Sequence, residues 1–237
     1  MKGFVVALQF LTRLPMPRVE TGAEDLATSM RWFPAAGLVV GLIVATATWA
    51  GGLIGPWVGA LLGLIAWVGV TGALHIDGLS DLADAVGAAH KDRERFLAVM
   101  ADPHVGSFGV VAIGLQLIAK LVFLQSMTAG FQPVLMLIPF AARLGPLVWS
   151  YDLPPLHTGI AARFTSVVRV RDIVFWSLML AVAALCDPAI LAALLLIGGW
   201  DWWLHRTLGG VSGDCHGAGI ELVETGLLLA VLVGGKI

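Results

Sequence analysis

The chain has 237 residues, of which 58% are hydrophobic and only 13% are charged, and its mean hydropathy is +0.90. A soluble domain carries roughly 25% charged residues, so the composition excludes an ordinary soluble protein and predicts an all-α, polytopic membrane protein, one domain over residues 1–237. A net charge of −2 without a basic tract gives no sign of a nucleic-acid partner. The two cysteines, Cys186 and Cys215, lie too far apart for a CxxC motif or a disulfide framework.

The first apolar run, residues 4–11, is short, and Arg13 follows it closely. Neither a membrane span nor a signal peptide with a small-residue cleavage site fits this pattern. An interfacial helix that ends before Pro15 and Pro17 is the prediction.

Seven apolar runs then follow, and we expect each to cross the membrane. The two runs on either side of Asp187-Pro188 are each shorter than the roughly 20 residues that a span needs. They predict either two spans or one broken helix, and the second case would move the last polar patch to the other side of the membrane. The expected spans are residues 34–53, 57–76, 108–127, 133–149, 173–186, 189–204 and 220–233.

The basic residues predict the orientation. With seven spans and the N-terminus inside, the loops on the opposite side contain no Lys or Arg. Lys236, near the C-terminus, is the one basic residue that this arrangement places on the opposite side. Basic residues gather on the cytoplasmic side of membrane proteins, so the side of the N-terminus is predicted to be cytoplasmic. It holds Lys2, Arg13, Arg18, Arg31, Lys91, Arg93, Arg95, Arg163, Arg169, Arg171 and Arg206.

Three aspartates follow the second apolar run with helical spacing. Asp77, Asp81 and Asp84 stand at i, i+4 and i+7, which places them within roughly 60° of one another on a helix. Three such carboxylates suit a hard divalent cation, Mg²⁺ or Mn²⁺. The alternative is a solvated acidic face, but carboxylates at a membrane boundary are costly and more often functional.

Two basic residues fall inside apolar runs. Arg143 lies in mid-span, where a charge must face the protein interior. A contact to an anionic substrate and a structural ion pair are both open. Lys120 has a long stem that can snorkel toward the interface.

A glycine-dense segment, residues 209–219, surrounds Ser212, Asp214 and His216. Glycines bring backbone N–H groups close to a phosphate, and Asp214 adds a metal ligand or a base. Together with the acidic helix and the arginines, this segment predicts phosphate chemistry with a bridging metal.

Several motifs, in this order along nearly the whole chain, resemble those of the cobalamin synthase family. They are Leu8-Gln-Phe-Leu-Thr-Arg-Leu-Pro-Met-Pro17, Trp32-Phe-Pro34, His75-Ile-Asp-Gly-Leu-Ser-Asp-Leu-Ala-Asp-Ala-Val-Gly87, Asp92-Arg-Glu-Arg95, Asp102-Pro-His-Val-Gly-Ser-Phe-Gly109, Gly209-Gly-Val-Ser-Gly-Asp214 and Gly217-Ala-Gly-Ile-Glu221.

The resemblance implies a Mg²⁺-dependent transferase of the bacterial inner membrane with its active site facing the cytoplasm. It would join adenosylcobinamide-GDP to α-ribazole or its 5′-phosphate and release GMP. Its partners would be these two substrates and membrane lipid, without nucleic acid, and a homo-oligomer is open.

The resemblance also implies site residues. The metal would be held by Asp77, Asp81 and Asp84, and the catalytic set would be Asp81, Asp84 and Asp214, with Asp84 or Asp214 taking the proton of the attacking hydroxyl. The expected substrate-binding residues are Arg93, Arg95, His104, Arg143, Ser212 and Gly213.

Two other functions compete. CDP-alcohol phosphotransferases of lipid synthesis also use spaced aspartates on membrane helices, but the Ala-Arg pair of their pattern is missing after Asp77-Gly78. A non-enzymatic transporter is less favoured, because the charges gather on one side rather than near the midplane.

Overall fold

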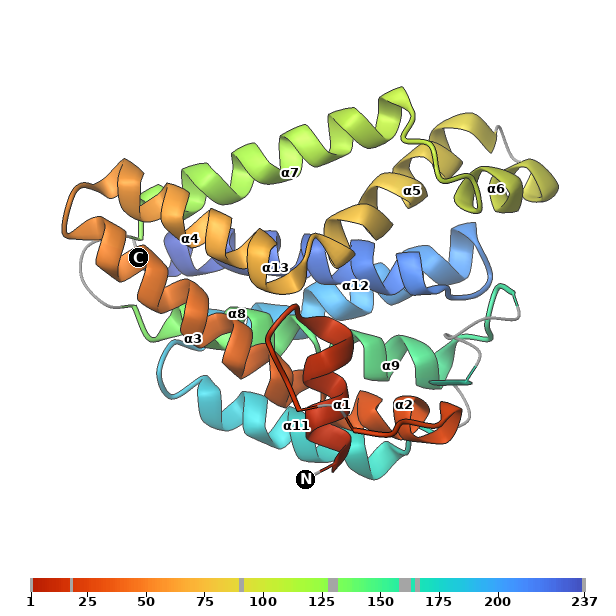
Figure 1. The fold of residues 1–237 in the computed structure, drawn as a ribbon, viewed down its shortest axis with the longest axis horizontal. Coiled ribbons are helices and arrows are strands. Elements are labelled where there is room, and N and C mark those ends of the chain that lie inside the picture. The colour runs from red at the N-terminus through yellow and green to blue at the C-terminus, as the bar shows by residue number, and fades with distance from the viewer. Residues whose placement is uncertain are drawn as a thin grey trace.

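The computed structural model describes residues 2–17, 19–89, 92–127, 132–157, 163–164 and 167–235. Nearly all of these residues lie in helices, and an isolated bridge between Pro155 and Val211 is the one strand-like pairing among them. Long apolar helices stack side by side, with α1 lying across them (Figure 1). The predicted all-α, polytopic class is confirmed.

The helices divide the chain into long apolar elements and short connecting ones. They are α1 (Lys2–Leu11), α2 (Ala23–Ser29), η1 (Met30–Trp32), α3 (Phe33–Gly52), α4 (Pro56–Thr71), α5 (Leu74–Ala89), α6 (Arg93–Met100), α7 (Ser107–Gln125), α8 (Val134–Ala142), α9 (Gly145–Asp152), α11 (Val170–Ala183), η2 (Pro188–Leu191), α12 (Ala192–Thr207) and α13 (Gly213–Gly234).

Fewer helices than the seven expected are long and apolar enough to cross a membrane. Five segments in the described part of the chain meet this test, and a sixth does if the bent pair α4–α5 counts as one span. The element that falls short is α11, with 14 residues. The five are Ala23–Gly52, Ser107–Gln125, Val134–Asp152, Pro188–Thr207 and Gly213–Gly234.

The two short apolar runs form two helices rather than one broken helix. The chain reverses between α11 and α12 and returns along the bundle (Figure 1). Asp187 begins the return, because its side chain accepts a hydrogen bond from the Ala189 N–H at 2.9 Å and caps η2. Gly234 at the end of α13 lies beside Ala189, so the C-terminal end of α13 is at the same end of the bundle as this reversal.

The second expected span stops earlier than its hydropathy suggests. Gly72 and Ala73 adopt left-handed backbone conformations, with φ of 61° and 59°, and the Ala73 N–H returns to the Val68 carbonyl at 3.0 Å. This is the hydrogen-bond pattern that ends a helix at a glycine. The axis therefore turns by 84° between α4 and α5, and α5 carries the aspartates in a new direction.

Glycines let the first helices approach closely. A Cβ at Gly51 would lie 2.8 Å from the Gly59 Cα, and one at Gly37 would meet the backbone of Pro139 on α8. Small residues at such contacts are typical of closely packed membrane helices. Gly55 differs, because nothing lies within 4 Å of the position of its Cβ.

Candidate functional site

The site begins where α5 crosses the first turn of α13. The three aspartates lie on α5, as their spacing predicted. A Cβ on Gly78 would lie 2.9 Å from the Asp214 Cα, and one on Gly217 would lie 3.2 Å from the His75 carbonyl oxygen. These two glycines let the backbones touch, and the contact brings Asp214 to the aspartates of α5.

Four carboxylates therefore gather in one place. Asp77, Asp214 and Asp84 each repel the carboxylate of Asp81, which is partly withdrawn from solvent. Within the described part of the chain, no ion pair joins Asp77, Asp81 or Asp214 to a basic side chain. His157 is close enough to act electrostatically on Asp214, and it was not among the predicted site residues.

Asp84 has a different environment from the other three. One of its carboxylate oxygens accepts from the Gly106 N–H at 2.7 Å and the other from the Gly109 N–H at 2.9 Å. These are N-terminal N–H groups of α7, which have no partners within their own helix. Asp84 therefore caps α7 from a neighbouring helix, and each of its oxygens already accepts one backbone hydrogen bond.

The donor set fits magnesium better than a metal that needs a closed cage. Among the described residues, no three His, Cys, Asp or Glu side chains lie in ligating geometry. Mg²⁺ keeps several waters and is usually bound by one or two carboxylates plus substrate phosphates. One or two of Asp77, Asp81 and Asp214 can supply the carboxylates of such an open site, because no ion pair to a described Lys or Arg neutralises them.

A cavity of about 210 Å³ lies against this cluster. Its wall includes Asp77, Asp214, His75, His216 and Gly213 at the start of α13. We call it the central cavity. His75 and His216 were not predicted as site residues, although both stand within the motifs that suggested the site.

His216 has a clear structural role beside the cavity. Its Nε2 lies 3.1 Å from the Ser150 hydroxyl, and its ring stacks on Trp149. The Trp149 indole N–H in turn donates to the Ile197 carbonyl at 3.1 Å. These contacts join α9, α12 and α13 directly behind the carboxylates.

Ser212 and Gly213 form the start of α13. The Ser212 hydroxyl accepts from the Cys215 N–H at 3.2 Å and donates to Asp214 at 3.5 Å. Ser212 is thus the N-cap of α13, while Gly213 lines the cavity. The structure places Gly213 where a substrate can touch it, whereas Ser212 caps α13.

A second cavity, of about 420 Å³, lies further along α5. We call it the outer cavity, and its wall is mostly apolar, with Phe96, Leu156 and Leu208. Arg93 lines it and donates from Nη1 to the Leu208 carbonyl at 3.2 Å. Arg93, an expected substrate-binding residue, therefore lines the outer cavity and not the central one.

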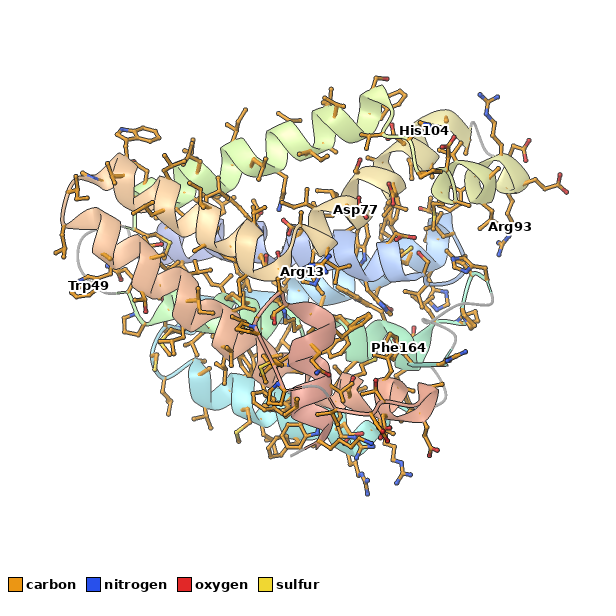
Figure 2. All side chains as sticks on the ribbon, in the orientation of Figure 1. Arg13, Trp49, Asp77, Arg93, His104 and Phe164 are labelled. Carbon is orange, nitrogen blue, oxygen red and sulfur yellow. The ribbon has the colours of Figure 1, made fainter. Side chains whose placement is uncertain are left out.

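Arg95 and His104 line neither cavity. Arg95 is exposed on α6. The Nδ1 of His104 lies 2.6 Å from Asp102 in the connection to α7, near the end of the bundle that carries Arg93 (Figure 2). Hydrogen bonds from the His104 backbone N–H and then from its side chain hold the pKa of Asp102 below its usual range.

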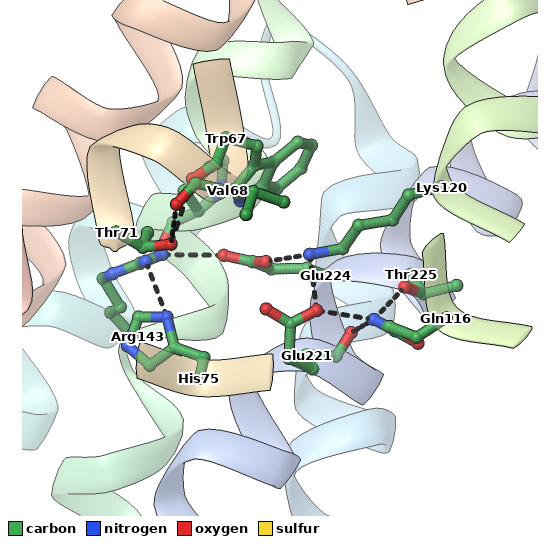
Figure 3. Close-up of polar contacts among 11 residues, drawn as sticks. Trp67, Val68, Thr71, His75, Gln116, Lys120, Arg143, Glu221, Glu224 and Thr225 are labelled. Atoms are coloured by element: carbon green, nitrogen blue, oxygen red, sulfur yellow. Dashed lines mark hydrogen bonds and ion pairs between the residues drawn. The ribbon is translucent and has the colours of Figure 1, made fainter. Parts of the chain in front are cut away.

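Arg143 is fully buried and paired, so the geometry is that of a structural ion pair. Its Nη1 donates to Glu224 at 2.8 Å and to the Pro139 carbonyl at 3.0 Å. Lys120 lies 2.6 Å from Glu224 and 2.7 Å from Glu221. The two cations and two anions form one buried network (Figure 3). The glutamates within the last apolar run were the sequence signal for these partners.

The family follows from comparison with known proteins. The family described as Cobalamin-5-phosphate synthase matches residues 3–232. A protein of Novosphingobium aromaticivorans named adenosylcobinamide-GDP ribazoletransferase is 61% identical over 240 residues, which cover 99% of this chain and 98% of that one. Proteins with the same name from Laribacter hongkongensis and Thiobacillus denitrificans are 49% and 46% identical, covering 100% and 97% of this chain and 99% and 94% of theirs. No solved structure matches. The chain belongs to the cobalamin-5-phosphate synthase family, and it is a membrane-embedded transferase of cobalamin synthesis.

Proposed function

We propose that this transferase joins adenosylcobinamide-GDP to α-ribazole, or to α-ribazole 5′-phosphate, and releases GMP. The observation that carries the proposal is the meeting of Asp77, Asp81 and Asp214, with Asp77 and Asp214 in the wall of the central cavity and no ion pair from the three to a described Lys or Arg. Carboxylates in this arrangement suit a diphosphate substrate that arrives with a divalent metal. The names of the relatives supply the substrates, and the chemistry of the site agrees with them.

Magnesium is the metal that we propose, with one or two carboxylate ligands drawn from Asp77, Asp81 and Asp214 and the rest from water and substrate phosphate. When bound, it would neutralise the diphosphate and the charge that develops on the departing GMP. Asp84 would support the site by fixing the start of α7 against α5, because both of its oxygens accept backbone N–H groups there.

The chain's own residues then have simple tasks in the transfer. A free ribose hydroxyl of the ribazole attacks the phosphorus bonded to the cobinamide arm, a new P–O bond forms, and the bond to the GMP phosphate breaks. This hydroxyl is not the 5′-hydroxyl, because that oxygen carries the phosphate in α-ribazole 5′-phosphate. The hydroxyl proton needs an acceptor within hydrogen-bond reach. Asp214 suits this role better than Asp84, because Asp214 faces the central cavity while Asp84 is occupied by the cap of α7.

We also propose that the site faces the cytoplasm across a bacterial inner membrane. Helix α6, with Arg93 and Arg95, lies at the same end of the bundle as the connection from α12 to α13, next to Arg206 (Figure 1). The described residues that connect α3 to α4 and α11 to α12, at the opposite end, include no Lys or Arg. Basic residues prefer the cytoplasmic side, which supports this orientation.

Purified protein in liposomes tests the proposal. GMP should appear only when adenosylcobinamide-GDP, α-ribazole and Mg²⁺ are all present, together with one corrinoid product per GMP. Omission of each component in turn is the control. Absence of GMP from the complete mixture would overturn the proposal, and CMP release from CDP-diacylglycerol would favour the lipid phosphotransferase instead.

A further inference from the structure

One buried donor at the central cavity has no partner in the site as described so far. His75 lies on the first turn of α5, is 3% exposed, and lines the central cavity. Its Nδ1 lies 3.5 Å from the Arg143 Nη2. Its Nε2 is buried and has no hydrogen-bond partner among the described residues.

The contact with Arg143 fixes which ring nitrogen carries the proton. A guanidinium group has only donors, so the Nδ1 of His75 must be the acceptor. The proton of the neutral imidazole is then on Nε2, which makes Nε2 a donor. Arg143 cannot turn away, because Glu224 and the Pro139 carbonyl hold the other terminal nitrogen.

A buried N–H group without a partner is uncommon in folded proteins. The unpaired atom here belongs to a residue of the cavity wall that also holds Asp77 and Asp214. Both carboxylates are acceptors, which phosphate oxygens avoid unless a metal intervenes. A donor in the same wall is what an anionic phosphate oxygen needs on the side that the metal does not cover.

We propose that the Nε2–H of His75 donates a hydrogen bond to an anionic phosphate oxygen of the nucleotide-activated substrate. His75 is then a substrate-binding residue, and its imidazole is not the base that takes the hydroxyl proton. Arg143 and Glu224 act through it, since Arg143 contacts the Nδ1 of the ring and Glu224 holds Arg143 in place (Figure 3). The inference rests on the proposed function for the identity of the substrate.

Two substitutions by amide residues distinguish the role of Nδ1 of His75 from the role of Nε2. His75→Gln places an N–H donor near the position of Nε2, while His75→Asn reaches only the position of Nδ1 and keeps a polar partner for Arg143. The dissociation constants of adenosylcobinamide-GDP and of inorganic pyrophosphate, measured with Mg²⁺ by equilibrium dialysis, give the effect on binding. Thermal unfolding in detergent shows whether each variant is folded.

The Asn variant should bind both ligands about 10- to 100-fold more weakly than the wild type, as expected for a lost hydrogen bond to a charged group. The Gln variant should recover most of that loss at an unchanged unfolding midpoint. Equal binding by both variants, or recovery by Asn alone, would overturn the inference. A wild type that binds pyrophosphate but not adenosylcobinamide-GDP would overturn the proposed function while leaving the donor role supported.

Discussion

Asp81 and Asp84 lie less than one helical turn apart on α5, yet their surroundings give them opposite roles. Asp84 accepts two backbone N–H groups of α7, whereas Asp81 is surrounded by other carboxylates. Their spacing in the sequence predicted a shared face, and both do lie on one helix. It could not show that Asp84 caps a helix that begins 23 residues later.

Replacing Asp84 should therefore reduce stability, whereas replacing Asp81 should not. In Asp84→Asn an NH₂ group faces one of the two N–H donors, at a cost of about 1–3 kcal/mol. Asp81→Asn removes repulsion from Asp77, Asp84 and Asp214, so metal-free stability should be unchanged or higher. Thermal unfolding of both variants in detergent without Mg²⁺ measures the difference. A lower midpoint for Asp81→Asn than for Asp84→Asn would contradict the assignment.

Arg143 belongs to the buried network, so its replacement should lower the free energy of unfolding. Arg143→Leu leaves Glu224 with Lys120 as its remaining partner in a fully buried position. Breaking a buried pair typically costs about 3–5 kcal/mol. The double variant Arg143→Leu/Glu224→Gln should recover part of this, because no unpaired charge is left at Glu224. If the single variant unfolds at the wild-type midpoint, Arg143 is not part of the network that holds the bundle.

At the scale of the element, the sequence predicted the helix α5 but not its direction. The apolar run continues from α4 through Ile76, and hydropathy contains no information about a turn of the axis. The turn arises from two consecutive left-handed residues, Gly72 and Ala73. A glycine at that place is common, but alanine in this conformation is disfavoured and gives no local signal.

The contact between α5 and α7 depends on Gly109. A Cβ there would overlap the side chains of Ser80 and Asp84. Gly109→Ala should therefore destabilise the protein by about 1–3 kcal/mol, the usual range for an overpacked site. Gly114 on the same helix is the matched control, because nothing lies within 4 Å of the position of its Cβ.

Thermal unfolding should show a lower midpoint for Gly109→Ala and no loss for Gly114→Ala. Activity should follow the same order, since displacement of α7 also disturbs the hydrogen bond by which Asp84 caps that helix. Equal midpoints for the two variants would mean that α7 does not rest on α5 as described.

At the scale of the whole molecule, the positions of the connections were more predictable than the number of spans. The sequence predicted seven spans, and five or six described segments meet the length and hydropathy test. The shortfall comes from α11, which is short, and from α4–α5, which is bent. The site itself combines segments far apart in the sequence, so the role of His75 depends on a partner, Arg143, that only the fold brings close.

The two cysteines of the chain allow a direct test of orientation. Cys186 is exposed in the connection between α11 and α12, whereas Cys215 is buried. A membrane-impermeant maleimide should label Cys186 from the periplasmic side. In a Cys186→Ser background, Arg206→Cys should react only in inside-out vesicles. Labelling of both positions from one side would contradict the proposed arrangement.

The central claim is that Asp81, with Asp77 and Asp214, provides the ligands of the divalent metal, whereas Asp84 stabilises the fold by capping α7. Mn²⁺ can take the place of Mg²⁺ and is detected by electron paramagnetic resonance. Measurement of Mn²⁺ binding to the purified protein therefore tests this claim without turnover. Asp81→Asn should lose most of the bound Mn²⁺, because the metal loses a charged oxygen ligand. Asp84→Asn should keep it at temperatures where the variant is folded. Wild-type Mn²⁺ binding by Asp81→Asn, or its loss only in Asp84→Asn, would contradict the account.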